Sequence, residues 1–353
     1  MSKSKQVRYG FIGAGGIARA HASAIEAVGD KIVAVMDVNK ETGEAFANDY
    51  SADYVTTRVS NLVSRDDIDA VIVCTPNAFH AQQTIMALQS GKHVLCEKPM
   101  SVNVSQAKKM IQIAKKSKRI FTVGYVRRFM PTSEAVKSKI NKGELGNIYY
   151  AESKWLRRRG VPGYGGWFTT KKLSGGGPLI DLGCHMIDLV NWFIGYPKPK
   201  RVFATSGCHI ANKNYVYLSM WGKENPKGVY DVEDYASAMI RYDNGATVLL
   251  QVAWAINMPQ DTQLETWVAG DKAGCVTDGS NVIFAGQEAP NALTELNYRV
   301  KEANCFERQI AHFSECIKSG NQPRVKPEEA LIVQQILQAI YDSSKLKREI
   351  IIR

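Results

Sequence analysis

Apolar and polar positions follow two alternating rhythms along the first third of the chain. Short, nearly continuous apolar runs rich in β-branched residues are separated by longer segments whose apolar residues recur at helical spacing. The runs predict strands at 7–13, 31–38, 69–75, 93–99 and 120–126, and the segments predict helices at 15–28, 41–50, 78–89 and 102–116. Repeated strand–helix units favour an α/β fold with a parallel, doubly wound sheet and right-handed crossovers.

After residue 126 the pattern changes toward extended segments. Two long β-rich runs flank Asp243-Asn244-Gly245, which is a strong hairpin signal. The other predicted elements are a strand at 148–157, helices at 132–140, 304–319 and 327–344, and a short strand at the end of the chain. Long paired strands combined with flanking helices predict an α+β domain with a large antiparallel sheet.

The length of the chain fits two globular domains. It has 353 residues, of which 45% are hydrophobic and 22% charged, and such a length suggests two domains. We place the first at 1–126 and the second at 127–353. Because no apolar run reaches the roughly 18–20 residues of a membrane helix, no membrane partner is expected.

Charge and cysteine content exclude several other classes of protein. The net charge is +11, but the basic residues are scattered apart from Arg157-Arg158-Arg159 and short lysine pairs. Such scatter is usual for a solvated surface, so no nucleic-acid partner is expected. Seven cysteines without a CxxC pair argue against a disulfide framework and a thiolate zinc site, and they predict a reducing, cytoplasmic location.

GAGGIA, which begins at Gly13, has the form of a dinucleotide-binding loop. It follows the first predicted strand and opens the first predicted helix, where Gly13 permits a tight turn and Gly15 lets a pyrophosphate approach the backbone. The start of the helix supplies amide donors for phosphate. We expect cofactor contacts at Gly13, Gly15, Gly16 and Ile17.

Asp37 ends the second predicted strand, about two dozen residues after the glycine loop. An acidic residue there binds the ribose hydroxyls of a dinucleotide. Its charge would repel a ribose 2′-phosphate, so the sequence favours NAD over NADP, although Lys40 nearby could soften this preference.

Two further motifs, CTPNAFH and CEKPM, follow later strands of the predicted sheet. Ligands of open α/β sheets bind beyond the carboxyl ends of the strands, so both motifs are expected to face the cofactor. Taken alone, Lys98 would be interpreted as a solvated loop lysine. The candidate cofactor residues of the two motifs are Thr75, Pro76, Asn77, His80, Glu97 and Lys98.

The stretch GGGPLIDLGCHMIDL places three ionisable residues on one helix face. Asp181, His185 and Asp188 follow one another at spacings of four and three. They could be helix decoration, a metal site or acid–base machinery; a metal is not expected, because no further His/Cys cluster is evident. His185 suits a base because the ordinary pKa of histidine is near 6.5, and Asp181 could bind a substrate hydroxyl or orient the imidazole.

The glycine loop, TPN, EKP and the DxxxH helix, in this order, resemble the Gfo/Idh/MocA oxidoreductase family over essentially the whole chain. The family includes glucose–fructose oxidoreductase and inositol dehydrogenase. The resemblance implies a Rossmann domain followed by an α/β domain with a large, open, mostly antiparallel sheet. It also implies association into homodimers, homotetramers or larger homo-oligomers through that sheet.

The same resemblance implies roles for particular residues. Lys98 matches the EKP lysine that touches both nicotinamide and the reacting oxygen, and Asp181 and His185 match the DxxxH pair. GYVRRF looks like the segment that passes the nicotinamide in inositol dehydrogenases, which implies that Tyr125 and Arg127 border the cofactor. We therefore expect Lys98, Asp181 and His185 to be catalytic, whereas Asp188, one turn deeper, is expected to be structural.

The loop between the arginine triplet and the DxxxH helix is expected to set substrate specificity. Its aromatic residues could stack on a sugar ring, although they could equally belong to a core or an interface. The loop departs from that of simple inositol dehydrogenases, so a glycoside or pyranose oxidised at the 3-position fits at least as well as inositol. The candidate substrate contacts are Tyr125, Arg158, Tyr164, Trp167, Asp181 and His185.

These features predict an NAD-dependent dehydrogenase that acts on a ring hydroxyl of a sugar, glycoside or cyclitol. A redox-assisted glycosidase, which oxidises the ring transiently and eliminates the aglycone, would use the same residues. A non-catalytic NAD(P)-binding regulator is the third alternative, against which the intact Lys98, Asp181 and His185 argue.

Overall fold

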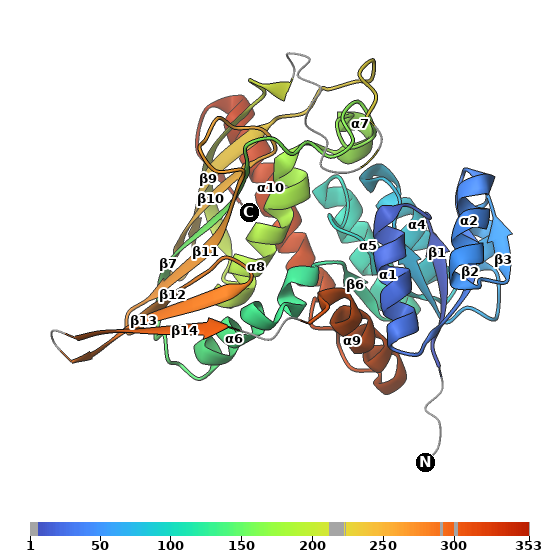
Figure 1. The fold of residues 1–353 in the computed structure, drawn as a ribbon, viewed down its shortest axis with the longest axis horizontal. Coiled ribbons are helices and arrows are strands. Elements are labelled where there is room, and N and C mark those ends of the chain that lie inside the picture. Colours follow the sequence, from blue (N-terminus) through green and yellow to red (C-terminus); the bar gives the residue numbers. More distant parts are fainter. Residues whose placement is uncertain (1–5, 212–221, 223, 290–291, 300–302, 353) are drawn as a thin grey trace. The chain divides into compact units, whose positions relative to one another are not determined.

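The computed structural model describes residues 6–211, 222, 224–289, 292–299 and 303–352 (Figure 1). Contacts divide the chain into two compact units. Unit 1 comprises Met1–Val126 and Asn304–Leu331, and unit 2 comprises Arg127–Ala303 and Ile332–Arg353.

Unit 1 is built on a six-stranded parallel sheet with the order β3-β2-β1-β4-β5-β6. The chain order reverses between β1 and β4, which is the topological switch point of a doubly wound sheet. Its strands are β1 Arg8–Ile12, β2 Lys31–Met36, β3 Tyr54–Thr56, β4 Ala70–Val73, β5 His93–Cys96 and β6 Phe121–Val123. Its helices are α1 Gly16–Ala27, α2 Lys40–Tyr50, α3 Val59–Val63, α4 Asn77–Gln89, α5 Val104–Ser117 and α9 Cys305–Ser319.

The predicted α/β fold of this unit is confirmed, and the differences lie at element ends. The predicted strand at 93–99 stops at Cys96, because the chain turns into the EKP motif, where Pro99 has no N–H for a sheet. The predicted helix at 102–116 begins at Val104 because the Asn103 side chain caps it by accepting the Gln106 N–H. The short elements β3 and α3 gave no recognisable pattern.

The last part of unit 1 comes from far along the chain. The Tyr9 hydroxyl lies 2.6 Å from the Ser314 hydroxyl, and the rings of Tyr9 and Phe313 lie 6.3 Å apart. Ile310 and Phe313 of α9 belong to the same buried core as the first strands. Residues 304–331 therefore pack with the first unit, which corrects the expectation that the second domain runs unbroken through 127–353.

Unit 2 contains a nine-stranded sheet with the order β14-β13-β12-β11-β7-β10-β9-β8-β15. Among the described strands, β7 and β10 pair in parallel and the other neighbours are antiparallel. The strands are β7 Ile148–Arg157, β8 Pro199–Gly207, β9 Tyr235–Tyr242, β10 Thr247–Ala253, β11 Thr262–Gly270, β12 Ala273–Thr277, β13 Asn281–Ala289, β14 Ala292–Arg299 and β15 Ile350–Ile351. The predicted large, mostly antiparallel sheet is confirmed.

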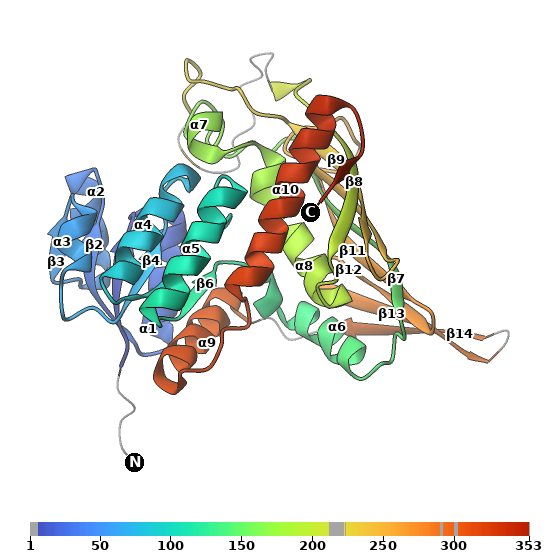
Figure 2. The same cartoon turned by 180° about the vertical axis from the view of Figure 1, so that it is seen from behind.

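Helices pack against one face of this sheet, as Figure 2 shows for α6 and α8. The described helices of unit 2 are α6 Pro131–Asn141, α7 Lys171–Ser174 and α8 Cys184–Ile194, and α10 Pro327–Leu346 is divided between the two units. A 3₁₀ turn covers Val126–Phe129, and a π-helical turn at Leu179–Gly183 leads directly into α8. No helix in the described part of the chain is long and apolar enough to cross a membrane.

Candidate active site

The glycine loop leaves room for a phosphate group. Gly13 has φ +96°, and a Cβ atom there would lie 2.7 Å from the Cys74 carbonyl oxygen, so only glycine fits. In contrast, no atom lies within 4 Å of the position that a Cβ would take at Gly15 or Gly16. Gly15 precedes α1 without a side-chain cap, and Ile17 is 38% exposed. The loop therefore offers both amide donors and space to a dinucleotide.

Asp37 is fixed beside this loop at the end of β2. Its Oδ2 accepts the Ala14 N–H at 2.9 Å, and its Oδ1 accepts the Asn39 N–H at 2.9 Å. A carboxylate has about four lone-pair positions, so two backbone bonds leave capacity for ribose hydroxyls. The structure thus brings Asp37 and the glycine loop together, as the sequence predicts for a ribose-binding carboxylate.

The TPN motif and the EKP motif are tied to each other through His80. This side chain is 1% exposed, and its ring nitrogens lie 2.8 Å from the Pro99 and Thr75 carbonyl oxygens. Burial lowers the pKa of His80, while the two carbonyl contacts raise it. Pro76 forms the N-cap of α4, whose first residue is the buried Asn77. His80 thus lies between the two loops and supports their shape.

The EKP motif follows β5 and contains a cis peptide bond between Lys98 and Pro99. Glu97 is 5% exposed. Its Oε1 lies 2.6 Å from Nε2 of His21, and its Oε2 accepts the Lys98 N–H at 3.1 Å. Glu97, which the sequence predicts at the cofactor, is therefore a buried residue that supports the lysine loop. Tyr125, predicted beside the cofactor and substrate, is 1% exposed in the same unit.

In unit 2, Asp181 and His185 lie one turn apart where the π-helical turn runs into α8. They are 7% and 8% exposed. Oδ2 of Asp181 accepts the indole N–H of Trp254 at 3.0 Å, and the His185 ring lies 6.3 Å from the ring of Trp155 on β7. The sheet therefore positions both residues, and π-helical turns recur at functional sites.

A buried carboxylate starts this helical segment. Oε1 of Glu233 accepts the N–H groups of Gly177 and Leu179 at 3.0 and 3.1 Å and the Tyr341 hydroxyl at 2.9 Å. A Cβ atom would lie 1.9 Å from the Tyr341 hydroxyl at Gly176 and 2.1 Å from the Glu233 carbonyl oxygen at Gly177. Close packing therefore explains why these positions of the glycine run carry no side chain.

Asp188 belongs to a fully buried ion pair. The Arg128 guanidinium donates to Oδ2 at 2.9 Å and to Oδ1 at 2.7 Å, and the Tyr196 hydroxyl donates to Oδ1 at 2.7 Å. These contacts give Asp188 the structural role expected from its depth on the helix. Within the described chain, no group of three or more His, Cys, Asp or Glu side chains is arranged to hold a metal ion.

Two guanidinium groups flank Trp155, the neighbour of His185. The Arg127 group lies 4.1 Å from the ring centroid and the Arg157 group 5.1 Å from it. Arg157 is 8% exposed and donates to the Gly160 carbonyl oxygen at 3.2 Å. Burial lowers the pKa of Arg157, and the charge of Asp181 raises it. The structure thus places Arg127 beside the tryptophan that faces His185.

The aromatic loop divides into a packing part and a part that leads to Asp181. Tyr164 is 2% exposed, stacks on Tyr230 at 5.3 Å and donates its hydroxyl to the Ala211 carbonyl oxygen at 3.1 Å. Trp167 stacks on Phe168 at 3.7 Å, and Phe168 meets the Trp254 ring edge at 6.4 Å.

Arg158, the remaining candidate of this loop, is half exposed and forms an ion pair with Asp261. The structure therefore links Trp167 to Asp181 through ring contacts and keeps Arg158 on the surface. Contact of any of these side chains with substrate stays a prediction.

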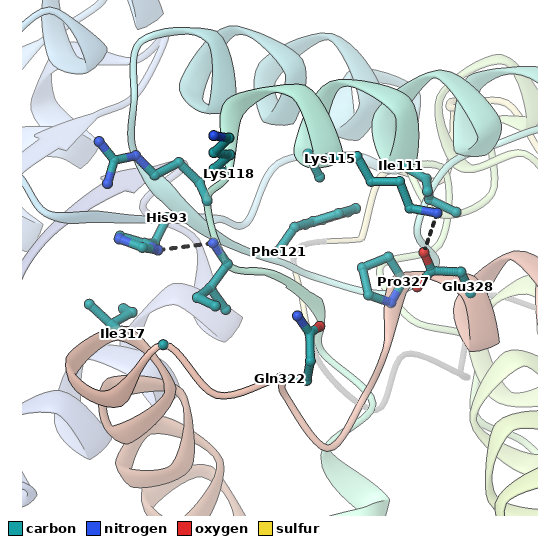
Figure 3. A pocket seen from close by; sticks show the side chains of 13 residues that line it. His93, Ile111, Lys115, Lys118, Phe121, Ile317, Gln322, Pro327 and Glu328 are labelled. Atoms are coloured by element: carbon teal, nitrogen blue, oxygen red, sulfur yellow. Dashed lines mark hydrogen bonds and ion pairs between the residues drawn. The ribbon is translucent and has the colours of Figure 1, made fainter.

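Two hollows in unit 1 lie at the amino ends of its strands. The first, a pocket of about 580 Å³, adjoins the amino ends of β5 and β6 (Figure 3). There Lys115 pairs with Glu328 at 2.9 Å, and α5 and α9 both end nearby, where the negative ends of the helix dipoles favour cations rather than phosphates.

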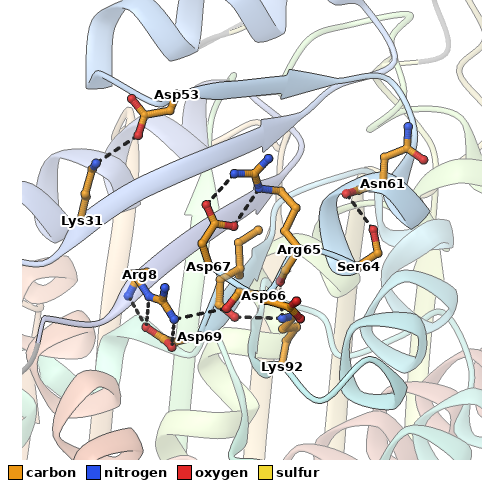
Figure 4. A network of polar contacts seen from close by, with 11 residues as sticks. Arg8, Lys31, Asp53, Asn61, Ser64, Arg65, Asp66, Asp67, Asp69 and Lys92 are labelled. Atoms are coloured by element: carbon orange, nitrogen blue, oxygen red, sulfur yellow. Dashed lines mark hydrogen bonds and ion pairs between the residues drawn. The ribbon is translucent and has the colours of Figure 1, made fainter.

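A network of polar contacts surrounds the second hollow, as Figure 4 shows. Arg8 makes a two-pronged pair with Asp69 at 2.9 and 2.8 Å. Lys92 donates to the carbonyl oxygens of Arg65 and Ile68 at 2.5 and 3.0 Å. These contacts lie at the amino edge of the sheet, whereas the glycine loop, the TPN motif and the EKP motif follow the carboxyl ends of their strands, where open α/β sheets bind their cofactors.

The sheet topology, the open glycine loop and the Asp37 carboxylate beside it together define a dinucleotide-binding protein with a doubly wound sheet. A family model described as "Oxidoreductase family, NAD-binding Rossmann fold" matches residues 7–125. The model of the GFO/IDH/MocA C-terminal domain matches residues 133–276. The chain belongs to the Gfo/Idh/MocA family of oxidoreductases, and the predictions of this family and of NAD as its cofactor are confirmed.

Named relatives match nearly the whole chain. D-glucoside 3-dehydrogenase of Escherichia coli K12 is 31% identical over 344 residues, which span 97% of this chain and 96% of the relative. scyllo-Inositol 2-dehydrogenase (NAD(+)) of Bacillus subtilis is 27% identical over 336 residues, with coverage of 93% and 91%. A solved levoglucosan dehydrogenase in complex with NADH and levoglucosan has the same fold, with a TM-score of 0.87, 20% identity and coverage of 99% and 100%.

The sequence interpretation missed three residues that shape the site. Trp254 and Glu233 reach the DxxxH segment from strand ends more than fifty residues further along the chain. Arg128, the neighbour of Arg127 in the sequence, was not among the candidates, although it forms an ion pair with Asp188. The position of Trp254 at the end of a predicted β-rich run was a usable signal, whereas nothing local marks Glu233.

Proposed function

We propose that the protein oxidises a secondary ring hydroxyl of a sugar or glycoside, using NAD as the hydride acceptor. The observation that carries the proposal is the Asp181–His185 pair, whose members lie one turn apart and contact tryptophans of the sheet. A base for the hydroxyl proton is what alcohol oxidation requires of the protein, and histidine is the side chain best matched to neutral pH.

In this proposal the three motif residues divide the work. The imidazole of His185 takes the proton of the reacting hydroxyl and returns it in the reverse direction. The Lys98 ammonium stabilises negative charge that develops on the same oxygen. The Asp181 carboxylate, oriented by the Trp254 N–H, accepts a hydrogen bond from a substrate hydroxyl. The glycine loop and Asp37 would hold NAD, which would supply the hydride acceptor.

The names of the relatives support the substrate class. The E. coli relative that matches 97% of this chain is a D-glucoside 3-dehydrogenase, which favours oxidation at the 3-position of a pyranose or glycoside. The scyllo-inositol relative keeps cyclitols as candidate substrates. The ring contacts that connect Trp167 with Trp254 supply an aromatic surface of the kind that packs against sugar rings.

A substrate panel tests this function directly. Purified protein is mixed with NAD and with sugars, glycosides and inositols, and absorbance at 340 nm is followed. We expect NADH formation with at least one pyranoside, and loss of the signal when only its 3-hydroxyl is replaced by hydrogen. Release of aglycone without net NADH would instead indicate the redox-assisted glycosidase, and an inert panel with intact NAD binding would contradict both enzymes.

We further propose that copies of the chain associate through the face of the nine-stranded sheet that none of the described helices covers, here called the helix-free face. Four large apolar residues there are exposed by 38–55%. Strand register aligns them with their neighbours into one row across seven strands. The row consists of Phe203, Met239, Leu249, Glu152, Trp267, Val276 and Ile283. Six of its seven members are apolar, so we call it the apolar row, and a largely apolar strip of this extent fits a second copy of the same face.

A further inference from the structure

A buried histidine on α1 is joined to the main chain of Lys98 by one carboxylate. His21 is fully buried, and its Nε2 lies 2.6 Å from Oε1 of Glu97. The other oxygen of Glu97 accepts the Lys98 N–H at 3.1 Å. Because α1 begins at the glycine loop, the carboxylate connects the helix of the cofactor loop with the lysine of the EKP motif.

The fit around this carboxylate is close on every side. A Cβ atom at Gly124, just after β6, would lie 2.8 Å from Oε1 of Glu97. The ring of Phe306 meets His21 edge-on, with centroids 5.2 Å apart and an interplanar angle of 89°. Such packing holds the His21 ring and the Glu97 carboxylate in one arrangement.

The hydrogen-bond pattern sets the proton positions. Nδ1 of His21 is buried and has no hydrogen-bond partner within the described residues. A charged ring would bury a second N–H without an acceptor, so the neutral ring with its proton on Nε2 fits the site. Nε2 then donates to Glu97, which is the arrangement that stabilises an ionised carboxylate.

The charges that face Glu97 agree with an anion. Burial acts to raise the pKa of Glu97, but the His21 hydrogen bond and the Lys98 charge lower it below its ordinary value. Burial raises the pKa of the Cys74 and Cys96 thiols and lowers that of His80, so these neighbours stay neutral near pH 7. The titratable groups that face the carboxylate are His21 from α1, His80 from α4, Cys74 after β4, Cys96 of β5 and Lys98.

We propose that His21 is a positioning residue for Lys98 and acts through Glu97. The His21 N–H holds the carboxylate in place as an anion. That anion fixes the Lys98 main chain and supplies the negative charge that keeps the Lys98 ammonium protonated during turnover. The inference rests on the catalytic role proposed for Lys98.

Three variants on α1 separate this role from ordinary packing. His21→Phe keeps a ring but removes the donor, whereas His21→Gln places an amide N–H near the position of Nε2. Ile25→Ala, one turn further along α1 and also fully buried, removes packing without touching Glu97. Each variant is compared with the wild type for kcat, KM, the pH profile of kcat and thermal stability.

The expected results differ between the variants. His21→Phe lowers kcat by about tenfold or more, as loss of a supporting hydrogen bond does at metal-binding residues, and it changes KM less. The alkaline limb of its pH profile of kcat moves to lower pH. The reason is that the Lys98 ammonium releases its proton more easily once it loses its counter-charge. His21→Gln keeps most of kcat and leaves the alkaline limb at its wild-type pH. Ile25→Ala lowers the melting temperature without moving the alkaline limb.

A double variant tests whether His21 acts through Glu97. Glu97→Gln is expected to shift the alkaline limb as His21→Phe does, and the combination should be no worse than Glu97→Gln alone. Fully multiplicative losses would overturn the inference, as would a wild-type profile in folded His21→Phe. Should His21→Phe not fold, Gly124→Ala presses on the same carboxylate, and a wild-type profile there overturns the inference equally.

Lys98→Ala separates the inference from the proposed function. Near-normal turnover in Lys98→Ala would contradict the proposed chemistry itself. Loss of turnover in Lys98→Ala together with unchanged kcat and pH profile in His21→Phe would remove only the role of His21.

Discussion

Aromatic side chains hold the two unit 2 residues proposed to act on substrate. Trp254 donates an N–H to Asp181 and the Trp155 ring faces His185. A neutral donor orients a carboxylate without cancelling its charge, so Asp181 keeps its strength as an acceptor for sugar hydroxyls. The contrast with Asp188, fully buried against Arg128, shows how two aspartates of one helical stretch acquire different roles.

The first prediction concerns the proposed catalytic groups. His185→Ala and Lys98→Ala should each lower kcat by about 100- to 10,000-fold, the usual contribution of a positioned acid–base group, while NAD affinity stays nearly unchanged. NADH formation at 340 nm and NADH fluorescence on binding measure the two quantities. His209→Ala and Lys118→Ala, both exposed, serve as controls, and near-normal turnover in either test variant contradicts the mechanism.

A second prediction concerns the choice of cofactor. Asp37→Ala removes a carboxylate that both binds ribose hydroxyls and repels a 2′-phosphate, so NAD binding should weaken about tenfold or more and discrimination against NADP should relax. Titration with NADH and NADPH measures both effects. Asp53→Ala, which removes an exposed surface carboxylate, should change neither affinity; an unaltered NAD/NADP ratio in Asp37→Ala would exclude Asp37 as the ribose ligand.

At the scale of elements, the sequence predicts what depends on local pattern. Residues Ile148–Arg157 form the predicted strand to the residue, because alternating side chains and flanking glycines mark it. The π-helical turn at Leu179–Gly183 was not predicted, because its start depends on Glu233 and Tyr341, which arrive from distant elements. The motif residues of the candidate site were visible in the sequence, whereas Trp254 was marked only by its place at a strand end and Glu233 had no local signal.

His93 supplies a prediction at this scale, because it joins β5 to the chain that enters β6. Its Nδ1 accepts the Ile120 N–H at 3.0 Å (Figure 3). Burial, with the charge of Arg119, lowers the pKa of His93 to about 4. The unfolded chain binds this proton near pH 6.5, so His93 costs stability as the pH falls from about 6.5 to about 4.

His93→Asn tests the sign of this effect. The asparagine carbonyl can accept the same N–H but does not titrate, so its melting temperature should fall less between pH 7 and pH 5 than that of the wild type, by about 1–3 °C. Differential scanning fluorimetry measures the change, with exposed His209→Asn as the control. An equal loss in wild type and His93→Asn would show that His93 does not carry the pH dependence.

At the scale of the whole molecule, contacts between distant segments decide what the sequence cannot. Helix α9 was predicted from its periodicity, but its membership in unit 1 follows from the Tyr9–Ser314 hydrogen bond and the Phe313 packing. A local pattern shows that a helix has an apolar face, but not which of two sheets will cover it. The same limit applies to the helix-free sheet face, whose apolar row appears only when seven strands are aligned in register.

The last prediction concerns that face. Met239 and Trp267 are 43% and 40% exposed at two points of the apolar row, so a carboxylate at either position would be buried against a second copy. We expect the wild type to be a dimer or larger by light scattering, and Met239→Glu and Trp267→Glu to raise the dissociation constant at least about tenfold with the fold intact. Leu346→Glu, at a residue 51% exposed at the end of α10, should leave the assembly unchanged. A monomeric wild type at micromolar concentration, or an unaltered mass in both face variants, would show that this face does not assemble.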